Sequence, residues 1–279
     1  MRFFARLSLL PLLLAFATPP AAQPLPAQRD VPYVPTRQVT VEAMLRIANV
    51  GPKDFLIDLG SGDGRIVITA ARLHGTRGFG VDIDPARIRE SLENAREAGV
   101  ADRVSFLRQN LFETNLSKAT VITMYLLPQI NVKLRPKLLD LAPGTRIVSH
   151  DFDMGDWQPD LRSGVRGTGS EIYFWIVPAR VGGRWRVQPS GRGEPAFELE
   201  LNQRYQEIEA VMRGGRPASV MDTRLEGDRI QFIVVDSGDF AHRVRYEGRV
   251  HGNVMQGIAY GDGTAGRGEH KWRAVRTQP

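Results

Sequence analysis

Three glycines alternate with other residues directly after a short apolar run, and an aspartate precedes the first of them by two positions. The stretch DLGSGDG contains Asp58, Gly60, Gly62 and Gly64. Glycine adopts positive φ readily and lets a ligand approach the main chain, because it has no Cβ. A helix that begins at Arg65 would also direct free N–H groups and a partial positive charge at this loop. The spacing predicts a ligand site in which Asp58 lies near an ammonium or sulfonium group.

The same spacing disfavours a nicotinamide dinucleotide as the ligand. Dinucleotide folds use the pattern G-x-G-x-x-G, and the position of the third glycine, counted from Gly60, is occupied here by Arg65. Asp63 lies inside the loop, where an aspartate can stabilise a tight turn without any ligand. The loop therefore favours another kind of cofactor.

Strands and helices alternate in the part of the chain that contains this loop. Short apolar strands are expected at 55–59, at 78–82, near 105, from 120 and from 146, and helices at 41–48, at 65–73, from 84 and at 128–141. Such alternation predicts a doubly wound α/β fold, with parallel strands and helices on both faces of the sheet. The glycine loop then lies at the carboxyl edge, where open α/β sheets bind ligands.

The pattern changes toward the C-terminus. The runs EIYFWIV from Glu171 and RWRV from Arg184 are separated by a few residues that include two glycines, which predicts an antiparallel hairpin that closes the first sheet. After residue 188, short strands with Gly and Asp turns predict a smaller all-β domain, a barrel or a sandwich, over 189–279. The run QRYQEIEAVMR fits either a strand or a helix.

The N-terminal segment has the composition of a targeting sequence. Arg2 and Arg6 precede an apolar run over residues 7–17, and small residues and prolines follow. That run is shorter than the roughly 20 residues of a bilayer span. Residues 1–22 are therefore predicted to be a signal peptide that exports the protein to the periplasm, or else an uncleaved membrane anchor. Residues 23–30 would form a linker.

The composition narrows the possible functions. The chain has 279 residues, of which 42% are apolar and 24% charged, as in globular proteins. It contains no cysteine, which excludes disulfides and thiolate nucleophiles, and its five histidines show no metal-ligand spacing, so no metal is expected. The net charge of +6 is spread along the chain, so nucleic acid is not an expected partner.

The glycine stretch resembles the first motif of class I S-adenosylmethionine-dependent methyltransferases. Further pieces resemble the lysine methyltransferase group that includes the mitochondrial enzymes modifying the adenine nucleotide translocase and the c subunit of ATP synthase. These pieces are VPYVPT at 31–36, MYLLP at 124–128, PGTRIVS at 143–149 and DWQP at 156–159. The resemblance implies a Rossmann-like methyltransferase domain over residues 31–188, with S-adenosylmethionine as its cofactor.

The resemblance also assigns cofactor contacts. It implies that Asp82 binds the ribose hydroxyls, from which a carboxylate can accept two hydrogen bonds. Asp84 is the alternative, but it precedes Pro85 and is better explained as a helix N-cap. Asn110 stands where the family usually has an acidic residue near the adenine amino group, although an ordinary loop position would also explain it.

Two aromatic segments would surround the transferred methyl group. By resemblance, Tyr33 and Thr36 would lie against the cofactor or the incoming side chain, and Tyr125 and Pro128 would line the methyl-transfer site. A tyrosine face attracts a cation and helps to exclude water. Alternatively, Tyr125 caps a buried strand and the VPYVPT segment is an extended linker.

The implied reaction is methyl transfer to a protein lysine by in-line displacement, and the acceptor could be a membrane protein. No residue is required as a general base. His150, Asp151 and Asp153 are possible proton acceptors, but solvated loop residues are the preferred interpretation. Two other functions stay open: an exported, non-catalytic interaction module that recognises partners through its β-rich domain, and a small-molecule methyltransferase.

Overall fold

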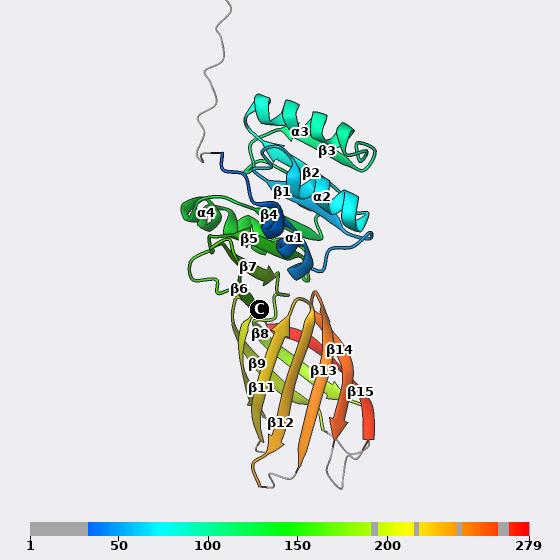
Figure 1. Ribbon diagram of the computed structural model, residues 1–279. Helices are drawn as coiled ribbons and strands as arrows, with labels where there is room; N and C mark the ends of the chain where they lie inside the picture. The colour runs from blue at the N-terminus through cyan, green and yellow to red at the C-terminus, as the bar shows by residue number, and fades with distance from the viewer. Residues whose placement is uncertain (1–32, 191–194, 215–217, 239–241, 262–267, 279) are drawn as a thin grey trace, which may run out of the picture.

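The computed structural model describes residues 33–190, 195–214, 218–238, 242–261 and 268–278. These residues form two domains, an α/β domain followed by an all-β domain (Figure 1). The predicted signal peptide or anchor over 1–22 and the predicted linker over 23–30 lie outside the described residues.

The α/β domain is built on a seven-stranded sheet in the order β3-β2-β1-β4-β5-β7-β6. The first five strands are parallel, and β7 runs antiparallel to both β5 and β6. The strands are β1 (Phe55–Leu59), β2 (Arg77–Asp82), β3 (Val104–Arg108), β4 (Val121–Met124), β5 (Arg146–His150), β6 (Leu161–Gly164) and β7 (Glu171–Ile176). The predicted parallel, Rossmann-like sheet is confirmed.

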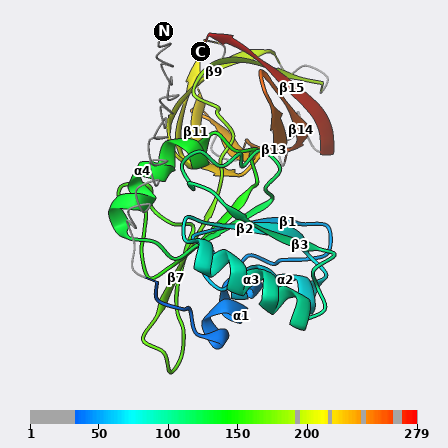
Figure 2. The same cartoon turned by 90° about the horizontal axis from the view of Figure 1, so that it is seen from above.

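Helices cover both faces of this sheet, as predicted. They are α1 (Gln38–Ile47), α2 (Arg65–His74), α3 (Pro85–Glu97) and α4 (Pro128–Leu139). Seen from above, α1, α2 and α3 lie on one face and α4 on the other (Figure 2). Neighbouring residues of β1 alternate between the two layers, with Leu56 in the core of α1 to α3 and Ile57 in the core of α4. Both faces are buried, which is why the inner strands β1 and β4 consist mainly of apolar residues.

The predicted closing hairpin is wrong in its second strand. The hairpin that closes the first sheet is β6–β7. The RWRV run belongs to β8 (Gly183–Pro189), which pairs with β9 (Phe197–Arg204) and β15 (Gly268–Gln278) of the second sheet. Trp185 and Val187 of β8 are buried in the core of the β domain, not in that of the α/β domain. The edge strand β6 is mostly exposed and lacks an apolar pattern, so its sequence LRSG gave no strand signal. The second sheet thus begins at Gly183, before the expected residue 189.

The second domain is one antiparallel sheet in the order β10-β9-β8-β15-β14-β13-β12-β11, which curls around its own core (Figure 1). Its further strands are β9 (Phe197–Arg204), β10 (Glu207–Arg213), β11 (Ala218–Glu226), β12 (Arg229–Asp236), β13 (Arg243–His251), β14 (Val254–Gly261) and β15 (Gly268–Gln278). The QRYQEIEAVMR run forms the β9–β10 hairpin, with Tyr205 at positive φ in its turn. Phe232, Tyr246 and Trp272 pack together inside the sheet.

Trp157 joins the two domains. Its side chain is completely buried, its Nε1 donates to Gln206 Oε1 at 2.8 Å, and its ring stacks on Tyr205 with 5.9 Å between centroids. Its backbone carbonyl accepts a hydrogen bond from Trp175 Nε1 of β7. The β9–β10 turn is therefore anchored directly to the DWQP segment of the α/β domain.

Replacing Trp157 should destabilise the protein strongly. Trp157→Ala removes a buried ring and leaves Gln206 without its donor, so we expect a loss of about 3–5 kcal/mol in the free energy of unfolding. Leu73→Ala is the control, because Leu73 is 53% exposed and such surface changes stay within about 0.5 kcal/mol. Equilibrium urea denaturation measures both variants. A Trp157→Ala midpoint equal to that of the wild type would contradict this role.

Candidate active site

The glycine loop connects β1 to α2 at the carboxyl edge of the sheet, and protein side chains pack tightly against it. Gly62 and Gly64 have φ of 53° and 81°. A Cβ at Gly62 would lie 2.5 Å from the Tyr33 ring, and one at Gly64 would lie 2.6 Å from the Phe106 ring. Both the backbone conformation and the space around it therefore require glycine. Gly64 is the N-cap of α2 and has no side chain, and the Asp63 carboxylate accepts a hydrogen bond from Arg65 N, the first amide of the helix, at 3.2 Å.

Asp58 is a buried carboxylate that lines a cavity beside the glycine loop. Its side chain is on β1, only 2% of the residue is exposed, and its Oδ1 accepts a hydrogen bond from Thr123 Oγ1 of β4 at 2.7 Å. Burial raises the pKa of Asp58 to about 7; the Thr123 hydrogen bond opposes this rise, and the charges of Asp63 and Asp82 add to it. Within the described part of the chain, no cation forms an ion pair with Asp58. An ammonium group of a ligand would supply the missing charge.

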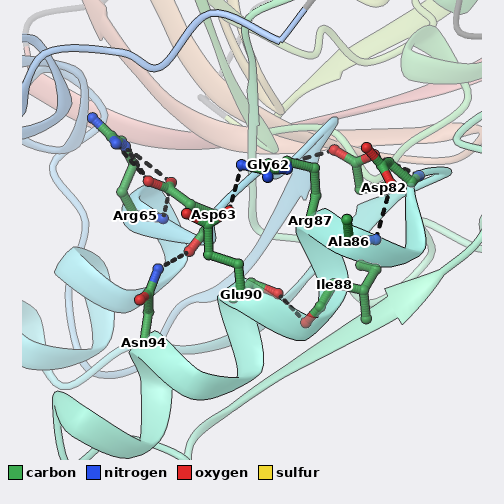
Figure 3. A network of polar contacts seen from close by, with 11 residues as sticks. Gly62, Asp63, Arg65, Asp82, Ala86, Arg87, Ile88, Glu90 and Asn94 are labelled. Atoms are coloured by element: carbon green, nitrogen blue, oxygen red, sulfur yellow. Dashed lines mark hydrogen bonds and ion pairs between the residues drawn. The ribbon is translucent and has the colours of Figure 1, made fainter.

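Asp82 connects the end of β2 to the glycine loop. Its Oδ2 accepts a hydrogen bond from Gly62 N at 3.0 Å (Figure 3). Its Oδ1 accepts one from Asp84 N at 2.9 Å. Asp84 accepts from Ala86 N at 2.9 Å and so is the N-cap of α3, as predicted. Both aspartates line the same cavity, but their hydrogen bonds differ: the Asp84 carboxylate caps its own helix, whereas the Asp82 carboxylate accepts from the glycine loop.

Asp63 does more than stabilise the turn. Its carboxylate accepts from Arg65 Nε at 2.9 Å, and Arg65 Nη1 donates to Thr36 O at 2.7 Å (Figure 3 shows Arg65 beside Asp63). Burial acts to raise the pKa of Asp63, but the hydrogen bonds and charge of Arg65 lower it below its ordinary value. The Arg87 guanidinium lies over the Tyr33 ring, 4.6 Å from its centroid. Arg65 and Arg87 thus hold residues 33–36 against the glycine loop.

Three aromatic side chains, those of Tyr125, His150 and Phe152, pack together, and Tyr125 and Phe152 line the same cavity. Tyr125 follows β4, and its ring lies 3.9 Å from the His150 ring and 6.2 Å from the Phe152 ring, measured between centroids. His150 is the last residue of β5 and is only 4% exposed, so its prediction as a solvated loop residue is wrong. Asp151 is half-buried, and only Asp153 is exposed as that prediction required.

Most of the predicted site residues line one cavity of about 260 Å³. They are Tyr33, Thr36, Asp58, Gly60, Gly62, Asp82, Asn110 and Tyr125. Two do not line it: Gly64 packs against Phe106, and Pro128 is the first residue of α4. Asn110 also organises its own loop, since its Oδ1 accepts from Phe112 N and its Nδ2 donates to Glu113 Oε1.

Sequence analysis missed several residues that line the same cavity. Arg65, Arg87, Phe112 and Phe152 come from helix and loop segments that only the fold brings together. The one available signal was Arg65, which occupies the position of the third glycine of dinucleotide folds. Within the described ranges, no group of three or more His, Asp or Glu residues is arranged to hold a metal ion, and no helix is long and apolar enough to cross a membrane.

Comparison with known proteins identifies the first domain. The family model "ANTKMT methyltransferase domain" matches residues 58–161. A protein-lysine N-methyltransferase of Saccharolobus islandicus is 50% identical over 151 residues, which cover 53% of this chain and 94% of that protein. The chain belongs to this methyltransferase family.

Two further similar proteins place this methyltransferase among S-adenosylmethionine-dependent enzymes. A crystal structure described as an RNA methyltransferase of Salinibacter ruber in complex with S-adenosyl-L-homocysteine is 53% identical, covers 53% of this chain and 96% of its own, and superposes with a TM-score of 0.51. The Mus musculus lysine N-methyltransferase of the ATP synthase c subunit is 34% identical over 144 residues, which cover 50% of this chain. The chain spans 57% of that mouse enzyme. The methyltransferase is a class I enzyme with S-adenosylmethionine as its cofactor.

The residues of the cavity fit this cofactor. Asp58 offers a buried carboxylate without an ion-pair partner, suited to the ammonium of the methionine part, and Gly60 and Gly62 of the loop line the same cavity. Asp82 would accept from the ribose hydroxyls, and Asn110 can donate and accept near the adenine. When bound, the cofactor supplies an activated methyl group, and the chain provides the orientation.

Asp82 and Asp84 should separate cofactor binding from helix capping. Asp82→Asn weakens the hydrogen bonds to a charged acceptor, so we expect S-adenosylmethionine affinity to fall by about 10- to 100-fold. Asp84→Ala should instead cost about 1 kcal/mol of stability through loss of the N-cap, with affinity close to that of the wild type. Isothermal titration calorimetry and thermal denaturation test the pair. A greater loss of affinity in Asp84→Ala would reverse the assignment.

Asp58 should make the stability of the cofactor-free protein depend on pH. Its pKa is about 7 when folded and about 3.9 when unfolded, so its contribution to stability is present below about pH 4 and is lost as the pH rises to about 7. Asp58→Asn removes this loss and keeps an acceptor for Thr123. We expect its melting temperature to exceed that of the wild type by a margin that grows between about pH 5 and about pH 8, while its S-adenosylmethionine affinity falls. A margin independent of pH would contradict this account.

Proposed function

We propose that this methyltransferase transfers the methyl group of S-adenosylmethionine to the side-chain amine of a protein lysine. The observation that carries the proposal is the 50% identity to a protein-lysine N-methyltransferase over 94% of its length. The cavity supports it, because carboxylates and aromatic side chains that line it come from different strands of the sheet. Asp58 and Asp82 belong to β1 and β2, whereas Tyr125 and Phe152 follow β4 and β5 on the other side of β1 in the strand order.

The chemistry of a lysine acceptor suits the aromatic side chains of the cavity. A free lysine has a pKa of about 10.4 and must lose a proton before it can attack, and an apolar slot lowers this pKa by removing water from the ammonium. The faces of Tyr125 and Phe152 can attract the positive charge that develops on the nitrogen. Orientation of acceptor and donor can contribute on the order of 7–11 kcal/mol in well-aligned systems. The reaction therefore relies mainly on geometry.

We also propose that the acceptor is a membrane protein. The mouse relative is named for the c subunit of ATP synthase. Apolar, half-buried side chains that line the cavity, those of Leu111, Phe112 and Leu127, suit an acceptor with an apolar surface around its lysine. RNA is the second candidate acceptor, because the Salinibacter ruber structure is described as an RNA methyltransferase. The two candidates differ in which polymer receives the methyl group, so one assay separates them.

Incubation with methyl-labelled S-adenosylmethionine and cell extract tests the proposal. Membrane and soluble fractions are assayed separately, each with protease or ribonuclease treatment afterwards. We expect most label in the membrane fraction, sensitive to protease, resistant to ribonuclease, and recovered as methyl-lysine after acid hydrolysis. The Asp82→Asn variant is the control and should incorporate much less label at limiting cofactor.

Two results would contradict the lysine proposal. Label that ribonuclease releases would assign RNA as the acceptor, and label confined to the low-mass fraction would assign a small molecule. Protease-sensitive label confined to the soluble fraction would retain the lysine acceptor and overturn only its membrane location.

A further inference from the structure

The Tyr125 ring packs against two neighbouring aromatic rings. His150 lies against one part of the ring at 3.9 Å and Phe152 stacks on it at 6.2 Å, measured between ring centroids. Thr36 Oγ1 lies 3.1 Å from His150 Nδ1, so the segment that covers the glycine loop also holds this histidine. Tyr125 itself lines the cavity. The orientation of its hydroxyl group is therefore set by the protein before any acceptor binds.

The hydroxyl group of Tyr125 points to the carboxylate of Asp151, a residue with an uncommon backbone conformation. Tyr125 Oη lies 3.4 Å from Asp151 Oδ2, a long hydrogen bond. Asp151 has a φ of 60°, in the left-handed region where residues other than glycine are uncommon. Its Oδ1 accepts from Glu171 N at 2.8 Å, and its own N–H donates to Glu171 O at 2.8 Å. Two hydrogen bonds to Glu171 of strand β7 thus hold Asp151 in place, with its Oδ2 toward Tyr125.

The negative charge of Asp151 is not neutralised by its neighbours. Of the residues that the structure describes, only His150 pairs with it, with His150 Nε2 at 3.3 Å from Asp151 Oδ2. This nitrogen is buried and lacks the alignment of a hydrogen bond. Burial lowers the pKa of His150, although the Asp151 charge acts to raise it, which favours the neutral imidazole. Burial and Asp151 raise the pKa of Tyr125, which keeps its phenol protonated.

These contacts define how the pair could act on an amine. The Tyr125 O–H donates to Asp151, so the lone pairs of the phenolic oxygen remain free as acceptors. Hydrogen bonds in series strengthen one another, and the carboxylate makes the phenolic oxygen a better acceptor. A neutral lysine amine could donate one N–H to this oxygen, which would fix the direction of its own lone pair.

We propose that Asp151 is a positioning residue that acts through the Tyr125 hydroxyl to orient the acceptor amine for methyl transfer. The inference rests on the proposed lysine acceptor. The lysine ammonium first loses one proton to water at the cavity mouth. The nitrogen lone pair then forms the N–C bond while the C–S bond breaks and its electron pair passes to sulfur. The product leaves as a methylammonium, whose new charge develops near the Tyr125–Asp151 pair.

A purely structural function of Asp151 is the competing explanation, and one substitution distinguishes the two. Asp151→Asn keeps an oxygen that can accept from Glu171 N, and asparagine tolerates the left-handed backbone conformation. The variant therefore removes the negative charge of residue 151 and retains its hydrogen bonds to Glu171. Tyr125→Phe removes the hydroxyl and retains the ring contacts. Asp102→Asn makes the same change of charge at a carboxylate that is 71% exposed, and serves as the matched control.

The first measurement needs no acceptor. Ultraviolet titration of phenolate formation, compared with Tyr125→Phe, reports the ionisation of Tyr125 in the folded protein. Asp151→Asn should lower the pKa of Tyr125, because it removes a negative charge beside the phenol, and Asp102→Asn should not. An unchanged Tyr125 titration in Asp151→Asn would overturn the proposed contact.

The second measurement is the rate of methyl-lysine formation in the labelled membrane extract. We expect Asp151→Asn and Tyr125→Phe each to lower kcat by about 10- to 100-fold, with the half-saturating extract concentration and the S-adenosyl-L-homocysteine affinity near those of the wild type. The double variant should be no slower than Tyr125→Phe alone, because both changes remove one interaction. The Asp102→Asn variant should match the wild type.

The possible failures of this experiment are distinguishable. If the wild type forms methyl-lysine and Asp151→Asn is equally active, the inference is wrong and the proposed function stands. If the losses of the two single variants multiply in the double variant, Asp151 does not act through Tyr125. If the wild type labels no lysine, the proposed function and this inference fail together.

Discussion

The hydrogen bond from Gly62 N to the Asp82 carboxylate joins the first two βα units of the sheet at its carboxyl edge. It holds the glycine loop next to the end of β2, so that the carboxylates of Asp58 and Asp82 face one cavity. This geometry requires a left-handed backbone at Gly62, and the Tyr33 ring leaves no room there for a Cβ. Cofactor binding and the covering segment 33–36 therefore both depend on the same glycine.

Charge is distributed unevenly around this cavity. Arg65 neutralises Asp63, whereas Asp58 remains buried beside a hydroxyl alone, with a pKa raised by its burial. An unpaired buried carboxylate costs stability unless a ligand compensates it. At the acceptor side, His150 is the one described residue that pairs with Asp151, and burial lowers the pKa of this histidine. The protein thus places a carboxyl group without a strong ion pair at each of the two places where a methyl donor and a reacting amine would bring positive charge.

Local pattern was sufficient to predict the parallel sheet, the glycine loop and the N-cap at Asp84, because each depends on residues close in sequence. It was not sufficient for the closing hairpin. Arg184 follows β7 closely in the chain, but β8 pairs with β15 and β9, and its apolar residues fill another core. Strand β6 carries no apolar alternation, since it lies exposed at an edge. Burial of His150 and the contacts of Arg65 with residues 33–36 arise from tertiary packing, which spacing alone does not encode.

We propose that the adenosyl sulfonium lies across the β1–α2 loop, between Asp58 and Asp82, and directs its methyl group toward Tyr125. A crystal structure of this protein with S-adenosyl-L-homocysteine is the decisive experiment. We expect the ligand ammonium at Asp58, both ribose hydroxyls at the Asp82 carboxylate and the sulfur facing the Tyr125 side of the cavity. Ribose hydroxyls bound by Asp84, or a ligand located outside this cavity, would contradict it.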